Sequence, residues 1–184
     1  MHRIGVYCGS RMGNSSEIQR SAYQLGQSIG RRGWTLVYGG GGIGLMKLVA
    51  DGVLEAGGQI IGVIPQMLVD RELAHKQVQD MRIVQSMHER KKLMADLATG
   101  FLALPGGFGT LDELCEIVTW SQLGLHQKPI VLLNWDGFYD EFIRFFEKMV
   151  QHDFMHSSYL KMIKITRQTE EALEIMSTRS NTIK

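Results

Sequence analysis

The hydrophobic residues of this chain fall into short runs that alternate with longer stretches, in which they recur every three or four positions. The short runs are typical of strands buried on both faces, and they cover residues 3–7, 35–38, 60–64, 81–84, 101–104 and 130–133. The longer stretches predict helices over residues 15–32, 45–56, 87–98, 111–123, 139–150 and 169–176. Residues 66–80 fit neither pattern and predict a loop with a short helix.

Strand and helix alternate along the sequence, which predicts an α/β fold: a Rossmann-like, three-layer α/β/α arrangement around a parallel sheet. No internal repeat, low-complexity tract or linker divides the sequence, so we expect a single domain over residues 1–184. A chain of 184 residues, 44% of them apolar, can bury a core without help from disulfides or a metal.

Charge and cysteine usage narrow the classes of partner. The net charge of +1 argues against binding nucleic acid through bulk charge, and no run of 18 apolar residues predicts a membrane span. Residues 1–7 contain no apolar signal core. Cys8 and Cys115 make neither a disulfide framework nor a metal set, and we expect both to be buried in a reducing compartment. The chain is therefore expected to be cytoplasmic, with no nucleic-acid or membrane partner.

Glycines gather where predicted strands end. They occur at Gly9 after the first strand, at residues 39–44 after the second, and at residues 106, 107 and 109 after the fifth. Ligands of open α/β sheets bind outside these strand ends, where glycine lets backbone N–H groups approach a phosphate. The sequence therefore predicts a phosphate-bearing ligand, with Gly9, Ser10, Gly41 and Gly42 among its contacts.

Two common phosphate motifs are weak or absent. Gly39, Gly41 and Gly44 fit G-x-G-x-x-G, but they follow the second predicted strand, and no acidic residue ends the next strand to hold a ribose. The pattern G-x-x-x-x-G-K-[ST] does not occur, and the histidines and cysteines lack metal-ligand spacing. We therefore expect no dinucleotide cofactor, no ATP-driven reaction and no metal.

An arginine lies on the apolar side of the predicted helix 87–98. Met87, Arg90, Met94 and Leu97 share one stripe at spacings of three and four residues. An arginine that faces inward needs a carboxylate or a phosphate, because an unpaired buried charge is very costly. The alternative is that Arg90, in the first turn of the helix, extends its charged end back to solvent.

Glu113 is the candidate partner of Arg90. Thr110 is a natural N-cap for the predicted helix 111–123, so Glu113 could merely complete a capping box. However, Glu113 and Glu116 are i,i+3 neighbours that repel each other unless a cation serves them, and Arg90 is the available one. A carboxylate at a helix N-terminus is expected to stay ionised. Beside an arginine and a phosphate cradle, it could stabilise a cationic sugar.

At these residues the sequence resembles the LOG (Lonely Guy) family of cytokinin riboside 5'-monophosphate phosphoribohydrolases, long labelled lysine decarboxylases. The family pattern P-G-G-x-G-T-x-x-E is complete over residues 105–113. Further matches, in the family's order, occur at residues 8–10, 38–46, 87–91, 119–124 and 128–129. The departures are Asp112, where Glu is commoner, and residues 11–16, which lack the proline often found there.

The resemblance implies hydrolysis of the N-glycosidic bond of a nucleoside 5'-monophosphate, which releases ribose 5-phosphate and a base, typically an N6-modified adenine. It implies no cofactor, and it makes Arg90 and Glu113 the catalytic pair. Substrate-binding residues that the matched motifs imply are Lys91, Gly107, Phe108, Gly109, Thr110, Leu111, Asp112 and Thr119, with Glu72 as a weaker match.

The resemblance also implies a homodimer with its sites near the subunit interface. Independently, the predicted helix 111–123 carries apolar residues on two sides, more than one sheet can cover. The first alternative function is a non-catalytic nucleotide or cofactor carrier, because relatives of this fold include molybdenum-cofactor carriers. The second is pyridoxal-dependent lysine decarboxylation, for which no segment singles out a Schiff-base lysine. Whether the substrate carries an isoprenoid group or is AMP stays open.

Overall fold

The computed structural model describes residues 2–71 and 73–178 and contains one sheet of seven parallel strands in the order β4-β3-β2-β1-β5-β6-β7. The strands are β1 Arg3–Tyr7, β2 Thr35–Tyr38, β3 Gln59–Pro65, β4 Asp80–Val84, β5 Gly100–Ala103, β6 Ile130–Leu133 and β7 Ile163–Thr166. From β1 to β4, each strand is added to the same edge of the sheet. β5 then pairs with the other edge of β1, and β6 and β7 follow on that side. The sheet therefore reverses its order at β1 and β5.

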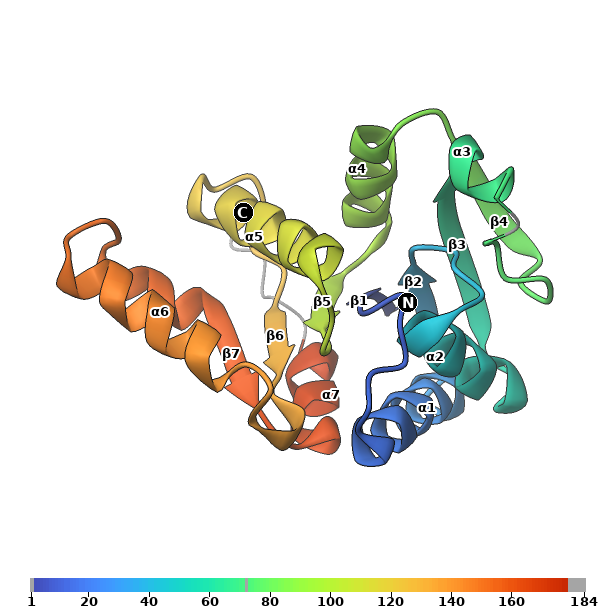
Figure 1. Cartoon of the computed structure of the whole chain (residues 1–184), viewed down its shortest axis with the longest axis horizontal. Helices are drawn as coiled ribbons and strands as arrows, with labels where there is room; N and C mark the ends of the chain where they lie inside the picture. Colours follow the sequence, from blue (N-terminus) through green and yellow to red (C-terminus); the bar gives the residue numbers. More distant parts are fainter. Residues whose placement is uncertain (1, 72, 179–184) are drawn as a thin grey trace.

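Helices cover both faces of this sheet (Figure 1). They are α1 Ser16–Arg31, α2 Gly44–Glu55, α3 Gln66–Val69, α4 Met87–Leu97, α5 Phe108–Gln122, α6 Asp140–Gln151 and α7 Thr169–Ser177. Two 3-10 turns, Trp135–Gly137 and Ser157–Met162, join the later elements. One apolar core lies between the sheet and α1, α2 and α7, and a second lies between the sheet and α4, α5 and α6.

Strand residues supply the two cores alternately, as the period of two in a strand requires. Val6 packs in the core under α1 and α2, whereas its neighbour Tyr7 packs in the core under α4 and α5. Helix starts are set locally: the Ser15 hydroxyl accepts a hydrogen bond from the Ile18 N–H at 3.3 Å and so caps α1.

The predicted α/β/α fold is confirmed, and each predicted strand and helix appears in order. The short helix expected within residues 66–80 is α3. The seventh strand was not predicted, because β7 is a four-residue edge strand whose two central residues, Lys164 and Ile165, are exposed. Within the described residues, no helix is long and apolar enough to cross a membrane.

Two local predictions are wrong. The helix predicted from residue 111 begins at Phe108, so Thr110 is its third residue and not its N-cap; Gly107 holds that position. Thr110 and Glu113 therefore do not form a capping box. Cys8 is buried as expected, but Cys115 is exposed, because it lies on the side of α5 that faces away from the sheet.

Candidate active site

A cavity of about 330 Å³ opens at the carboxyl ends of the central strands, next to the point where the strand order reverses. One side of the cavity is polar and comes from α4 and the start of α5, with Arg90 and Glu113. The other side is apolar. It is lined by Ile43, Met46, Ile64, Leu68 and Leu73.

The loops after β1 and β5 meet at the floor of this cavity. The Gly9 N–H donates to the Pro105 carbonyl at 3.1 Å, and the Met46 N–H at the start of α2 donates to the Gly9 carbonyl at 3.4 Å. Gly106 is required by this packing, since a Cβ there would lie 2.1 Å from the Thr110 hydroxyl oxygen. The glycine-bearing loops predicted at separate strand ends thus form one continuous surface.

The guanidinium of Arg90 is held by two backbone carbonyls and faces the carboxylate of Glu113. The Ser86 hydroxyl caps α4 by accepting the Glu89 N–H at 3.1 Å, which places Arg90 in the first turn of α4. The Arg90 Nε donates to the Val63 carbonyl at 3.1 Å, and its Nη2 donates to the Gly39 carbonyl at 2.9 Å. The residue is 8% exposed, so its charged end does not return to solvent. Its Nη1 remains directed at Glu113.

Glu113 lies on α5, with its Oε1 3.6 Å from the Arg90 Nη1 and its side chain 10% exposed. Burial raises the pKa of Glu113 from 4.5 to about 7; Arg90 opposes this rise, while Asp112 adds to it. The expectation that a helix N-terminus would keep this carboxylate ionised is therefore wrong, because α5 begins at Phe108 and Glu113 lies beyond its first turn, where burial decides the pKa. A carboxyl that titrates near neutrality can both accept a proton and stabilise a cation.

Lys91 forms ion pairs with two further acidic residues of α5, Asp112 and Glu116. Its Nζ lies 3.1 Å from a carboxylate oxygen of Asp112 and 3.1 Å from one of Glu116. The sequence assigned Glu116 to Arg90, which is wrong: Arg90 pairs with Glu113, and Glu116 pairs with Lys91. Burial of the ammonium lowers the pKa of Lys91, but the hydrogen bonds to both carboxylates outweigh it and raise the pKa overall. Consecutive cations on α4 thus match the acidic residues of α5.

The N-terminus of α5 opens into the cavity. Its N-cap, Gly107, makes no side-chain cap, and its first turn holds no acidic residue. The first N–H groups of a helix have no acceptor within the helix, and together with the helix dipole they favour an anion. A Cβ at Gly107 or Gly109 would meet nothing within 4 Å, so open space adjoins these N–H groups. This is where the structure can hold a phosphate.

The glycine loop after β2 makes contacts within the protein that the sequence did not predict. The Gly39 carbonyl holds Arg90, the Gly40 carbonyl accepts the His75 N–H at 2.9 Å, and the Gly42 N–H donates to the Leu73 carbonyl at 2.8 Å. These backbone groups are therefore occupied by the protein. A Cβ at Gly39 would lie 1.8 Å from the Arg90 Nη2, so glycine is needed here to admit the guanidinium.

The structure brings many of the sequence-predicted site residues to this cavity. Those that line it are Gly9, Ser10, Gly41, Arg90, Gly107, Phe108, Gly109, Thr110 and Glu113. Those outside its lining are Gly42, Lys91, Leu111, Asp112 and Thr119. Thr119 is exposed, and its hydroxyl donates to the Cys115 carbonyl at 2.7 Å. Glu72 lies outside the described residues. The assignment of roles to these residues stays a prediction.

Two features of the site could not be predicted from the sequence: the apolar wall formed by Leu68 and Leu73, and the backbone carbonyls that bind Arg90. Leu68 and Leu73 come from the segment between β3 and β4, where no periodic pattern marks them. Gly39 belongs to the predicted glycine loop, but nothing in its sequence context indicates that its carbonyl binds Arg90. Cys8 also lines the cavity, but burial raises the pKa of its thiol, which disfavours the nucleophilic thiolate form.

Known proteins resemble this chain in sequence. A family model described as "Possible lysine decarboxylase" matches residues 46–176. The cytokinin riboside 5'-monophosphate phosphoribohydrolase LOG of Oryza sativa subsp. japonica is 50% identical over 161 residues, which are 88% of this chain and 66% of the rice protein. This chain therefore spans just under two thirds of that relative. The corresponding LOG4 protein of Arabidopsis thaliana is 47% identical over 171 residues, 93% of this chain and 79% of that protein.

Solved structures resemble it in fold. The molybdenum cofactor binding protein of Rippkaea orientalis is 25% identical, with a TM-score of 0.73, and the match covers 95% of this chain and 94% of that one. The Moco carrier protein of Chlamydomonas reinhardtii is 23% identical, with a TM-score of 0.71 over 94% of this chain and 93% of that one.

The fold and the site define an α/β protein whose ligand cavity lies at the reversal point of a parallel sheet, with an arginine and a carboxyl paired in its lining. The relatives in sequence identify the family within this class of protein. The chain belongs to the LOG family of cytokinin riboside 5'-monophosphate phosphoribohydrolases.

Proposed function

We propose that this chain hydrolyses the N-glycosidic bond of adenosine 5'-monophosphates, with or without an N6 substituent, and releases the free base and ribose 5-phosphate. The names of its relatives support this reaction. The observation that carries it is the pairing of Glu113 with Arg90 beside the open N-terminus of α5. A phosphate on that N-terminus leaves the ribose within reach of the carboxyl.

The chemistry needs a stabilised sugar cation. When the bond between C1' and the base nitrogen breaks, its electron pair leaves with the base and positive charge develops on the ribose ring. The ionised Glu113 stabilises that charge and accepts a proton from the water that adds to C1', while the departing base nitrogen takes up a proton. Arg90 holds Glu113 in place and favours its charged form. Water is the only co-reactant.

A carrier function is the alternative, because the structural relatives include a molybdenum cofactor binding protein and a Moco carrier. A carrier needs the phosphate cradle but has no use for a buried carboxyl that titrates near pH 7. Desolvating such a group costs free energy, and this cost is expected where a reaction depends on it. The site therefore favours hydrolysis.

Lysine decarboxylation, which the family description names, needs a lysine at the reacting centre to bind pyridoxal phosphate as a Schiff base. The described residues that line the cavity include no lysine. Lys91, whose charge lowers the pKa of Glu113, forms ion pairs with Asp112 and Glu116. The cavity thus offers decarboxylation no suitable amine.

Incubation with AMP and with an N6-isopentenyl analogue, followed by chromatography, tests the proposal. We expect free base and ribose 5-phosphate in equal amounts from both nucleotides. Tight binding of AMP without release of adenine would overturn hydrolysis and favour the carrier. The ratio of the two rates identifies the preferred base.

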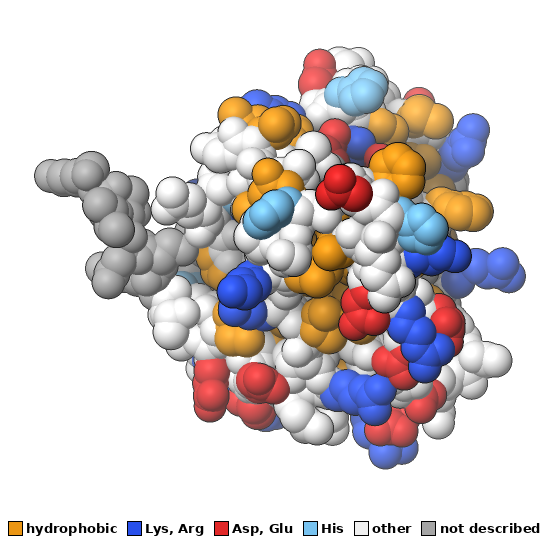
Figure 2. All heavy atoms as spheres, turned by 90° about the vertical axis from the view of Figure 1, so that its left-hand side faces the viewer, with side chains coloured by type: hydrophobic (Ala, Val, Ile, Leu, Met, Phe, Trp, Pro, Cys, Tyr) orange, Lys and Arg blue, Asp and Glu red, His pale blue; other side chains and the backbone are white. Residues whose placement is uncertain are grey.

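We propose a cytoplasmic homodimer as the working form. Apolar side chains remain exposed near α5 and α6, where Leu125 is 68% exposed, Phe145 51% and Phe154 87%. Figure 2 shows apolar side chains among charged ones on the face that carries α6. A second copy would cover such groups. The free thiols of Cys8 and Cys115 fit a reducing compartment.

A further inference from the structure

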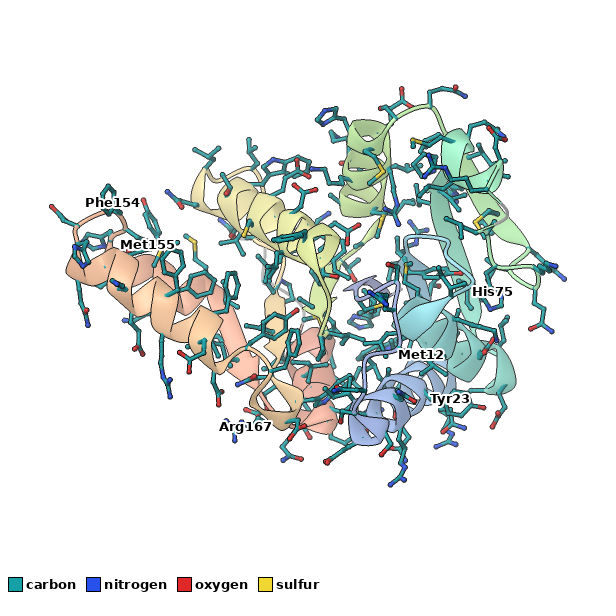
Figure 3. The ribbon with its side chains drawn as sticks, viewed as in Figure 1. Met12, Tyr23, His75, Phe154, Met155 and Arg167 are labelled. Atoms are coloured by element: carbon teal, nitrogen blue, oxygen red, sulfur yellow. The ribbon has the colours of Figure 1, made fainter. Side chains whose placement is uncertain are left out.

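His75 is a buried histidine outside the cavity, in the segment between α3 and β4, and it is 6% exposed. Its Nδ1 accepts a hydrogen bond from the Gln77 N–H at 3.3 Å. The ring proton therefore resides on Nε2, which donates to Asp51 Oδ1 at 3.0 Å. Asp51 belongs to α2, so this contact joins the segment to a helix of the main fold, beside which Figure 3 labels His75.

Residues 73–75 form a short strand-like strip along the glycine loop. Ala74 forms an antiparallel bridge with Gly41, and hydrogen bonds flank it on both sides, from the Gly42 N–H to the Leu73 carbonyl and from the His75 N–H to the Gly40 carbonyl. Backbone pairing of this length is weak alone. The side-chain contact between His75 and Asp51 adds a charge-assisted bond at the end of the strip.

The strip contributes Leu73 to the lining of the cavity. The phosphate and ribose belong on the polar side, at the start of α5 and near Glu113. The base is then left for the apolar part of the lining, which includes Ile43, Met46, Leu68 and Leu73 and suits a flat, largely apolar ring.

We propose that His75 and Asp51 are positioning residues, which hold the strip 73–75 as the wall on which the base rests and so set the affinity for the base. This inference rests on the proposed function for the identity of the ligand. Neither residue touches substrate; both act through Leu73.

Asp51 offers matched variants, because its two oxygens have different partners. Oδ1 accepts from His75, and Oδ2 pairs with Lys47, which is exposed. Asp51→Ala removes both contacts in a helix that tolerates alanine well. Asp51→Asn keeps an oxygen that can accept the His75 proton. Lys47→Met removes only the exposed ion pair and is the control.

Binding of two probes, AMP and ribose 5-phosphate, is measured by calorimetry in a Glu113→Gln background, in which AMP is expected to be consumed about 10²-fold more slowly or slower still. We expect Asp51→Ala to weaken AMP about tenfold, the effect of one charge-assisted hydrogen bond. Ribose 5-phosphate lacks the base and should bind within about twofold of the parent. Asp51→Asn and Lys47→Met should bind both ligands like the parent. Hydrogen exchange should show faster exchange in residues 73–79 of Asp51→Ala, with α5 unchanged.

Equal weakening of both ligands in Asp51→Ala would overturn the proposal, because it would indicate a general loss of structure. Unchanged AMP affinity with faster exchange would also overturn it and leave His75 a purely structural residue. If the parent protein releases no base from AMP but the selective loss of AMP affinity is found, the proposed function fails and the positioning role stands.

Discussion

Glu113→Gln should make the protein more stable above neutral pH while it destroys activity. Burial raises the pKa of Glu113 from 4.5 to about 7, so the unfolded chain ionises this group more readily than the folded one. The stability contributed by the protonated carboxyl is complete below pH 4.5 and is lost as the pH rises through 7. The difference between the two pKa values corresponds to roughly 3 kcal/mol, which is roughly 6–12 °C in Tm for a chain of this size.

Glutamine mimics the protonated carboxyl at every pH, so the variant and the parent should melt together near pH 4.5. At pH 8 the Tm of the variant should exceed that of the parent by roughly 6–12 °C. Base release from AMP should fall about 10²-fold or more, since the charge opposite the developing sugar cation is gone. Thermal melts from pH 4.5 to 8.5 and a chromatographic assay measure both effects. A Tm difference that does not vary with pH, or more than about half of the activity retained, would refute the reasoning.

Further perturbations probe the rest of the site. Gly39→Ala puts a methyl group where the guanidinium of Arg90 lies, so base release should fall about as far as in Arg90→Ala; normal turnover would contradict the seat assigned to Arg90. Lys91→Met removes the cation that balances the acidic neighbours of Glu113, so the acidic limb of the kcat/KM profile should move to higher pH; an unmoved limb would show that Lys91 does not act on Glu113. Adenosine should be hydrolysed far more slowly than AMP, because binding of the phosphate at α5 is used to reach the transition state, and comparable kcat/KM values would sink that role. Light scattering at micromolar concentration should give twice the mass of one chain, and a monomer would rule out the proposed homodimer.

The fold and the central pair of the site could be predicted from the sequence because each depends on a local pattern. Buried parallel strands are continuous apolar runs, and the inward stripe of α4 is visible from its spacing. Arg90 could be recognised as a buried cation in need of a partner, and Glu113 is the carboxyl that it meets at 3.6 Å.

The remaining features depend on tertiary contacts that no local pattern encodes. The sequence does not reveal that α5 begins at Phe108, because Thr110 is a favourable N-cap residue. In the structure the Thr110 hydroxyl instead lies against Gly106. The pKa of Glu113 follows from burial, because the earlier start of α5 places Glu113 beyond the first turn of the helix. The position of Leu73 in the apolar wall depends on backbone pairing between residues 73–75 and the glycine loop, which no periodic pattern in the sequence predicts.

Because β1 pairs with both β2 and β5, we expect the site to form late in folding. The Arg3 N–H donates to the Thr99 hydroxyl across 96 positions of sequence, and the β1–β5 register begins at Ile4 and Gly100. Closing so long a loop is slow, because its entropy is lost before the strand contacts compensate. A nascent chain that ends before β5 carries the apolar wall and Arg90 but lacks Glu113 and the cradle of α5. We therefore expect nucleotide binding to require the closed β1–β5 seam, and a bound nucleotide to draw the folding equilibrium towards that state.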